Sequence, residues 1–236
     1  MLNITVRQGH LEKQRADAII VNLFAESNRN LLKKVKGFVL NRSIQQAIDL
    51  KDFTGKLCET QLHYAPDSSP FRRILIIGLG YEKDFDLESA RRVAAVSIRK
   101  LDEIGVRSVA TTLFSVGSNN LSSQEMAQAL TEGSYLALYR FESHRSKKIN
   151  KGIQKLTVLA SEEKHLTCIK KGVKIGESIS EGTILARNLI NEPANVITPK
   201  ALANVAKELS QNHASIRCRV INERSIEKLG MGALLG

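Results

Sequence analysis

Apolar residues along the first two-thirds of the chain follow two periods, one typical of strands and one typical of helices. Asn3 to Arg7 and Ala16 to Phe24 have strand character, and the second stretch is rich in Ile and Val. Ile74 to Ile77 is a short continuous apolar run, which indicates a strand buried on both faces. Further predicted strands are Cys58 to Tyr64, Val106 to Phe114 and Leu156 to Ala160.

Two helices with clear start signals are predicted between these strands. Asp86 is placed to cap a helix with apolar residues at helical spacing, and Gly105 is placed to end it. Ser122 and Glu125 form the pattern of a capping box ahead of the second helix.

Turns, a loop and one more helix complete this half. Asn28-Arg29-Asn30 and Pro66 to Pro70 are turn signals. Leu31 to Leu50 is broadly helical, and Ser143 to Lys151 is expected to be a polar surface loop. Strands separated by helices of this length favour parallel pairing through right-handed crossovers. We therefore expect a three-layer α/β domain that ends near residue 162.

The last third is predicted to open a second α/β domain. A long helix is expected from about Glu163 to Leu189, and Thr198 with Pro199 provides an N-cap and first position for another. Apolar residues alternate with arginines over Ser215 to Val220, which favours a half-buried strand. Ser225 to Leu229 is a predicted short helix, so this domain is expected to be incomplete.

Composition places the chain among ordinary globular proteins, with 42% hydrophobic residues. The longest apolar runs fall well short of the ~20 residues of a membrane helix. The first seven residues alternate like a strand and do not match a secretion signal. Cys58, Cys168 and Cys218 are odd in number and far apart, which favours a reducing, cytoplasmic compartment. We expect all three to be small buried hydrophobes.

A formal net charge of +11 raises the question of an anionic partner. The lysines and arginines occur in scattered pairs, tryptophan is absent and aromatic residues make up 5% of the chain. A base-stacking platform is therefore poorly supported, and a solvated basic surface is favoured over specific nucleic-acid binding.

Two short patterns were weighed as sites. Gly78-Leu79-Gly80 follows a strand as in a dinucleotide fingerprint, but Lys83 stands where the third glycine belongs. A strand-end turn is the favoured interpretation. His165 and Cys168 share a helical face, but two ligands do not make a zinc site, so no metal site is predicted there.

Two strings near the end of the chain resemble the leucyl aminopeptidase (cytosol aminopeptidase) family: ARNLINEPANVITP at Ala186 to Pro199 and LGMGALLG at Leu229 to Gly236. The first is similar to the entry of that family's catalytic domain, and the second to a segment just before its metal site. We expect the first string to have a structural role, shaping the start of the catalytic domain, through the motif residues Asn191, Glu192, Pro193, Asn195, Thr198 and Pro199. The sharper alternative, Glu192 as a catalytic acid, is disfavoured because a lone carboxylate has no partner in view.

The resemblance implies a macro-like α/β N-terminal domain over residues 1–162. Residues 163–236 would then be a connecting helix and the truncated start of a metallopeptidase catalytic domain. It further implies that a complete member releases N-terminal residues, often leucine, from peptides with two divalent ions such as Mn²⁺ or Zn²⁺. Family members are typically cytoplasmic hexamers. Their metal ligands lie in later motifs, so we predict neither catalytic residues nor metal ligands in this chain.

Two hypotheses of different classes remain open at this point. The chain is either the N-terminal portion of such an exopeptidase, inactive by itself, or a non-catalytic basic α/β module that binds nucleic acid or a protein partner. The sequence also leaves open whether it represents a fragment or a natural truncation.

Overall fold

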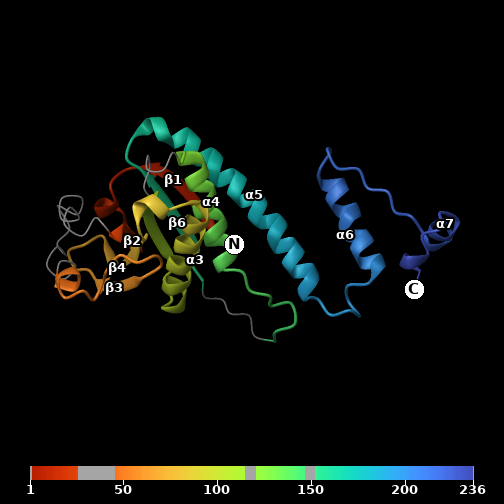
Figure 1. Cartoon of the computed structure of the whole chain (residues 1–236), viewed down its shortest axis with the longest axis horizontal. Helices are drawn as coiled ribbons and strands as arrows, with labels where there is room; N and C mark the ends of the chain where they lie inside the picture. The colour runs from red at the N-terminus through yellow and green to blue at the C-terminus, as the bar shows by residue number, and fades with distance from the viewer. Residues whose placement is uncertain (1, 26–45, 115–120, 147–151, 236) are drawn as a thin grey trace. The chain divides into compact units, whose positions relative to one another are not determined.

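The computed structural model describes residues 2–25, 46–114, 121–146 and 152–235 (Figure 1). Its strands are β1 Asn3–Gln8, β2 Ala16–Leu23, β3 Thr60–Tyr64, β4 Phe71–Gly78, β5 Ser108–Thr112 and β6 Lys155–Ala160. Its main helices are α3 Leu87–Glu103, α4 Ser123–Ala137, α5 Leu166–Asn191, α6 Pro199–Asn212 and α7 Glu223–Lys228. Short 3-10 helices are η1 Leu11–Lys13, η3 Glu82–Asp84, η4 Glu163–His165 and η5 Gly232–Leu234. The predicted turn at Asn28-Arg29-Asn30, most of the predicted helix Leu31 to Leu50 and the end of the predicted loop lie outside the described residues.

The six strands form one sheet in the order β1-β6-β5-β2-β4-β3. All neighbouring pairs are parallel except β3 with β4, which is antiparallel. The exception follows from the short connection, where the Ser69 N–H donates to the Pro66 carbonyl at 2.9 Å. β4 lies between two strands and its residues Ile74 to Ile77 are fully buried. The predicted α/β class, the parallel pairing and the doubly buried strand are confirmed.

Alternate residues of the same strands face opposite sides of the sheet, as the strand period requires. On one side the strands pack against α3, α4 and the beginning of α5, which supplies Ile169 and Val173 to that cluster. On the other side Leu11, Ala47 and Phe53 cover the sheet. No helix in these described residues is long and apolar enough to cross a membrane.

The predicted helix boundaries are matched closely at α3 and α4. The Asp86 side chain accepts a hydrogen bond from the Ser89 N–H at 2.7 Å, which caps α3. Gly105 follows the end of α3 with φ +74°, a conformation that favours glycine. The Ser122 and Glu125 capping box is present at the start of α4.

Three helices approach one another through glycines. A Cβ at Gly133 of α4 would lie 2.3 Å from the Arg91 carbonyl oxygen of α3. A Cβ at Gly172 of α5 would lie 2.1 Å from the Gln124 carbonyl oxygen of α4. One turn later, a Cβ at Gly176 would lie 2.8 Å from Thr131 Cβ. The contacts of α4 with both α3 and α5 therefore depend on the absence of side chains.

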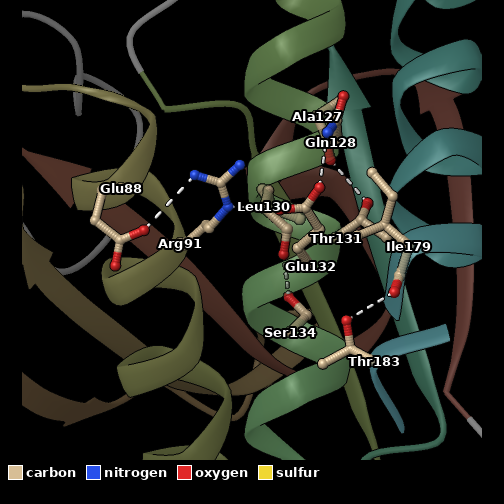
Figure 2. A network of polar contacts seen from close by, with 10 residues as sticks. All are labelled: Glu88, Arg91, Ala127, Gln128, Leu130, Thr131, Glu132, Ser134, Ile179 and Thr183. Atoms are coloured by element: carbon tan, nitrogen blue, oxygen red, sulfur yellow. Dashed lines mark hydrogen bonds and ion pairs between the residues drawn. The ribbon is translucent and has the colours of Figure 1, made fainter. Parts of the chain in front are cut away.

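A charged network joins α3 to α4 beside these contacts (Figure 2). The Arg91 guanidinium donates to the Glu132 carboxylate, and Gln128 Nε2 donates to the other carboxylate oxygen at 2.7 Å. Glu88 lies on the outer side of Arg91, with the two charged groups 3.6 Å apart. The nearly buried charge of Glu132 is thus satisfied from both helices.

The chain divides into two compact units, residues Met1–Ile184 and Leu185–Gly236. The predicted long helix is present, but Glu163–His165 is a 3-10 turn before α5 begins. Because α5 contributes core residues to the first unit, most of this helix belongs there. The boundary between the two domains near residue 162 stays a prediction.

The second unit corrects one expectation from the sequence. Ala214 and Ser215 form a turn and residues 216–220 have no regular secondary structure in the described structure, so the predicted strand at Ser215 to Val220 is wrong. A strand requires a neighbour, and this unit offers none. The predicted short helix is confirmed as α7, and Thr198 and Pro199 begin α6 as predicted.

The cysteines correct a second expectation. Cys58 is half-buried, while Cys168 and Cys218 are exposed, so the prediction that all three are buried is wrong. All three are free thiols. Cys168 lies on the exposed face of α5.

Tyr135 is expected to make the first unit sensitive to alkaline pH. Its hydroxyl donates to the Leu2 carbonyl at 2.8 Å and lies 3.2 Å from the Glu177 carboxylate. Burial first, and the Glu177 charge second, raise the pKa of Tyr135 from its ordinary 10.0 to about 12. The unfolded chain therefore loses this proton first, so the stabilisation is complete below about pH 10 and is lost as pH rises toward about 12.

Urea unfolding measured at about pH 9 and about pH 11 tests this expectation. At about pH 9 the Tyr135→Phe variant should be less stable than the parent chain, because it lacks the hydrogen bond. Between the two pH values, however, its free energy of unfolding should fall less than that of the parent chain. Parallel pH profiles for the two proteins would contradict the assignment.

Candidate functional site

The motif residues near the start of the second unit form a connection between two helices. Asn191 ends α5, and the Val196 N–H donates to the Pro193 carbonyl at 2.8 Å, closing a turn that includes Asn195. The Thr198 hydroxyl then accepts from the Ala201 N–H at 3.3 Å, and Pro199 is the first residue of α6. This geometry is that of a helix cap and a tight turn, and the functional role of these residues stays a prediction.

The glutamates that follow this turn in the sequence are not grouped as metal ligands in the described structure. Glu208 on α6 and Glu223 and Glu227 on α7 are exposed. Throughout the described ranges, no three or more His, Cys, Asp or Glu side chains come together in a way that could hold a metal ion. Zinc sites in proteins take three or four such donors, and the described side chains do not offer that set.

The His165 and Cys168 pair does not form part of a ligand set. His165 Nδ1 lies 3.5 Å from the Ser123 hydroxyl, while Cys168 is exposed on α5. The first contact ties η4, directly before α5, to the first residue of α4.

One open pocket of 290 Å³ lies at the carboxyl end of β4. The polar residues that line it are Thr54, Lys56, Tyr81, Asp84 and Ser89. The Thr54 hydroxyl donates to the Glu59 carboxylate at 2.9 Å. Apolar contact in the same pocket comes from Ala25, Leu57 and Leu79.

Gly80 lines this pocket, and Gly78 and Gly80 both make close contacts with the segment around Gly55 and Leu57. A Cβ at Gly78 would lie 2.0 Å from the Lys56 carbonyl oxygen. Gly80 has φ +75°, and its N–H donates to the Gly55 carbonyl at 2.9 Å. The glycines allow two chain segments to meet. The strand end predicted at Gly78-Leu79-Gly80 is confirmed, because β4 ends at Gly78, and the turn after it stays a prediction.

Cys58 follows directly after Leu57, which lines the pocket. Burial raises the pKa of its thiol, and the opposing charge of the Arg92 guanidinium only partly offsets that effect. The thiolate is the reactive form of cysteine. Cys58 is therefore held in its less reactive state.

Two family models match the chain in succession. The model of the cytosol aminopeptidase family N-terminal domain matches residues 20–148. The model of the same family's catalytic domain matches residues 184–236.

Curated relatives agree with these matches. A probable cytosol aminopeptidase from Alkaliphilus oremlandii is 32% identical over 239 residues, covering 100% of this chain and 47% of the relative. One from Nitrosococcus oceani is 29% identical over 241 residues, covering 99% of this chain and 47% of the relative. The chain thus spans about half the length of the curated relatives it matches.

Solved structures share the fold. A tomato leucine aminopeptidase mutant aligns with a TM-score of 0.83 at 22% identity, covering 100% of this chain and 47% of that one. The bottromycin maturation enzyme BotP, in a structure with Mn, aligns with a TM-score of 0.69 at 24% identity, covering 93% of this chain and 41% of its own. At these identities the likeness concerns the fold alone.

Proposed function

The chain belongs to the cytosol aminopeptidase family, and we propose that it is the N-terminal portion of a leucyl aminopeptidase-like exopeptidase. The observation that carries this proposal is the order of the two matches, N-terminal domain first and catalytic domain second. In such an enzyme, two divalent metal ions activate water and polarise the scissile carbonyl of a peptide.

The parts of the chain have different roles in this proposal. Residues 1–162 are the macro-like N-terminal domain, and residues 163–236 are the connecting helix and the start of the catalytic domain. The turn containing Asn191, Glu192, Pro193 and Asn195, with the cap formed by Thr198 and Pro199, sets the direction in which the catalytic domain begins. Its hydrogen bonds and two prolines support a positioning role.

Among the residues that the structure describes, no three or more His, Cys, Asp or Glu side chains come together as this metal site requires. No aspartate follows Asp102 in the sequence, and the last three glutamates are exposed on α6 and α7. No catalytic step is therefore assigned to any side chain of this chain. The activity belongs to the complete catalytic domain.

The proposal extends to the partners and location of the complete protein. Its substrate is a peptide with a free N-terminus, and its working form is a cytoplasmic homo-oligomer. Three free cysteines support a reducing compartment.

The purified 236-residue chain is expected to show no metal-dependent hydrolysis of leucine p-nitroanilide with Mn²⁺, Zn²⁺ or Co²⁺. A covalent chimera, in which this chain replaces the matching half of the Alkaliphilus oremlandii relative, is expected to be active. The relative itself serves as the positive control.

Two outcomes would contradict the proposal. Turnover by the isolated chain that persists through purification to homogeneity would overturn its inactivity. A chimera that unfolds cooperatively, yet shows no turnover, would overturn its role as the N-terminal portion of the enzyme.

A further inference from the structure

We propose that the open pocket at the carboxyl end of β4 binds a free amino acid with an apolar side chain. In this site the Lys56 ammonium holds the carboxylate of the amino acid, and the Asp84 carboxylate holds its ammonium group. The inference goes beyond the proposed function, because it places a ligand on the first unit and needs neither a metal ion nor a catalytic domain.

The pocket lies where the topology of an α/β sheet places ligands. β2 and β4 are parallel neighbours, and the lining includes Ala25, shortly after β2, and Leu79 to Tyr81, directly after β4. β4 continues into α3, which packs on one side of the sheet, whereas Ala47 and Phe53, which lie between β2 and β3 in sequence, pack on the other side. Open α/β sheets bind ligands at such a point, outside the carboxyl ends of strands whose connections leave toward opposite faces.

Hydrogen bonds fix the segment from Thr54 to Glu59, so one wall of the pocket is formed before a ligand arrives. One oxygen of the Glu59 carboxylate accepts from the Thr54 N–H and hydroxyl, both at 2.9 Å, and from the Lys56 N–H at 3.1 Å. Cys58 has φ +65°, which is uncommon for a residue other than glycine, and its N–H donates to the Gly78 carbonyl at 2.9 Å. Backbone held in this way clusters at ligand sites, and a preformed wall lowers the ordering cost of binding.

Lys56 and Asp84 bring opposite charges to the same pocket. Neither side chain makes an ion pair within the part of the chain that the structure describes, so the two charged groups do not neutralise each other. A ligand that carries both a carboxylate and an ammonium group can pair with both. A purely anionic ligand would be repelled by Asp84 and by Asp86, whose carboxylate accepts from the Ser89 N–H at the start of α3. The charges therefore favour a zwitterion.

The rest of the lining sets the size and polarity of the ligand. Ala25, Leu57 and Leu79 are apolar, which suits an apolar side chain. Pockets for drug-sized ligands span roughly 300–1,000 Å³, so a volume of 290 Å³ suits a smaller molecule such as leucine. A free amino acid of this kind is also what the proposed exopeptidase would release, so the site would let the first unit respond to product.

An NMR titration of the isotope-labelled 236-residue chain with L-leucine tests the proposal. Leucine at millimolar concentration should shift the amide signals of Leu57, Gly80 and Tyr81, and leave that of Lys170 on α5 unchanged. The chain is used by itself, so that the rest of an aminopeptidase offers no second place for leucine.

Three compounds related to leucine each lack one of the groups that the site recognises. Isocaproate lacks the ammonium group, isopentylamine lacks the carboxylate, and glycine lacks the apolar side chain. Each compound should bind at least about threefold more weakly than leucine, since even an exposed ion pair or a small apolar contact contributes to affinity.

Charge-removing variants test the two side chains directly. Lys56→Met and Asp84→Asn should each weaken leucine binding at least about threefold. Lys170→Met and Asp67→Asn are the matched controls, because both positions are exposed and lie outside the pocket lining, and they should bind leucine as the parent chain does. Since Lys56 and Asp84 are exposed as well, all four variants should keep the urea midpoint of the parent chain.

The outcomes separate this inference from the proposed function. The absence of local shifts with leucine overturns the amino-acid site, and so does equal affinity for leucine and any of the three related compounds. A Lys56→Met or Asp84→Asn variant that binds leucine as tightly as the controls overturns it too. None of these results affects the proposed function, which depends on the activity of the chimera. Leucine binding by the chain beside an inactive, folded chimera would uphold the site and overturn the proposed function.

Discussion

Gly172→Ala is expected to destabilise the first unit. Overpacking of this kind costs about 1–3 kcal/mol, and the expected loss lies at the upper end of that range. The new methyl would lie 2.1 Å from the Gln124 carbonyl oxygen and 3.0 Å from Ala127 Cβ on α4. A backbone oxygen cannot rotate away, so α5 must move from α4, which loosens the contacts of Ile169 and Val173. This loss outweighs the ~1 kcal/mol that alanine gains over glycine in a helix.

Gly182→Ala in the same helix is the matched control. A Cβ there meets nothing within 4 Å, so helix propensity alone operates. This variant should gain about 0.5–1 kcal/mol. Urea unfolding followed by circular dichroism gives both values, and equal stabilities for the two variants would refute the close approach of α4 and α5.

Arg91→Met is expected to cost about 2 kcal/mol, because it leaves a nearly buried carboxylate with a single donor. The Glu132 side chain is 7% exposed and Arg91 33% exposed, so water replaces the guanidinium only in part. Gln128 Nε2 remains as a donor to Glu132, but it carries no charge.

The double variant Arg91→Met with Glu132→Gln separates the ion pair from side-chain packing. If the stranded charge causes the loss, the double variant should recover most of it. Arg99→Met, at an exposed position on α3, is the control and should stay within about 0.5 kcal/mol of the parent chain. A double variant as unstable as Arg91→Met would assign the loss to packing of the arginine stem.

The features predicted correctly are those written in short-range patterns. The Asp86 cap, the Ser122 and Glu125 capping box and the turn at Pro66 to Pro70 depend on residues a few positions apart. The buried run Ile74 to Ile77 could be predicted as a central strand without knowledge of its neighbours, because a continuous apolar run is typical of a strand buried on both faces.

The features missed depend on residues far away in sequence. The segment at Ser215 to Val220 has the alternation of a strand, but pairing requires a neighbour that the described structure does not provide. The pocket at the carboxyl end of β4 joins residues that are as far apart in the sequence as Ala25, Thr54 and Ser89. Spacing alone did not signal it, although Gly78-Leu79-Gly80 marked the place where two backbones meet.

The spacing of small residues along α5 is a pattern in the sequence that the prediction did not use. Gly172 and Gly176 are separated by one helical turn, and Ser180 follows one turn later and is also buried. Small residues at this spacing let helix backbones approach closely. A search for that spacing would have predicted the face of α5 that packs on α4.

The central claim is that a first unit with a core of its own is followed by the beginning of a catalytic domain that has no core of its own. Hydrogen exchange on the dilute, isolated chain tests this claim most directly. Amides of residues 217–221 should exchange at nearly unprotected rates, because no strand partner covers them in the described structure. Amides of Ile74 to Ile77, buried between two strands, should exchange at least about a thousandfold more slowly. Equal protection of the two segments, unchanged on dilution, would contradict the account, because the second unit would then possess a core of its own.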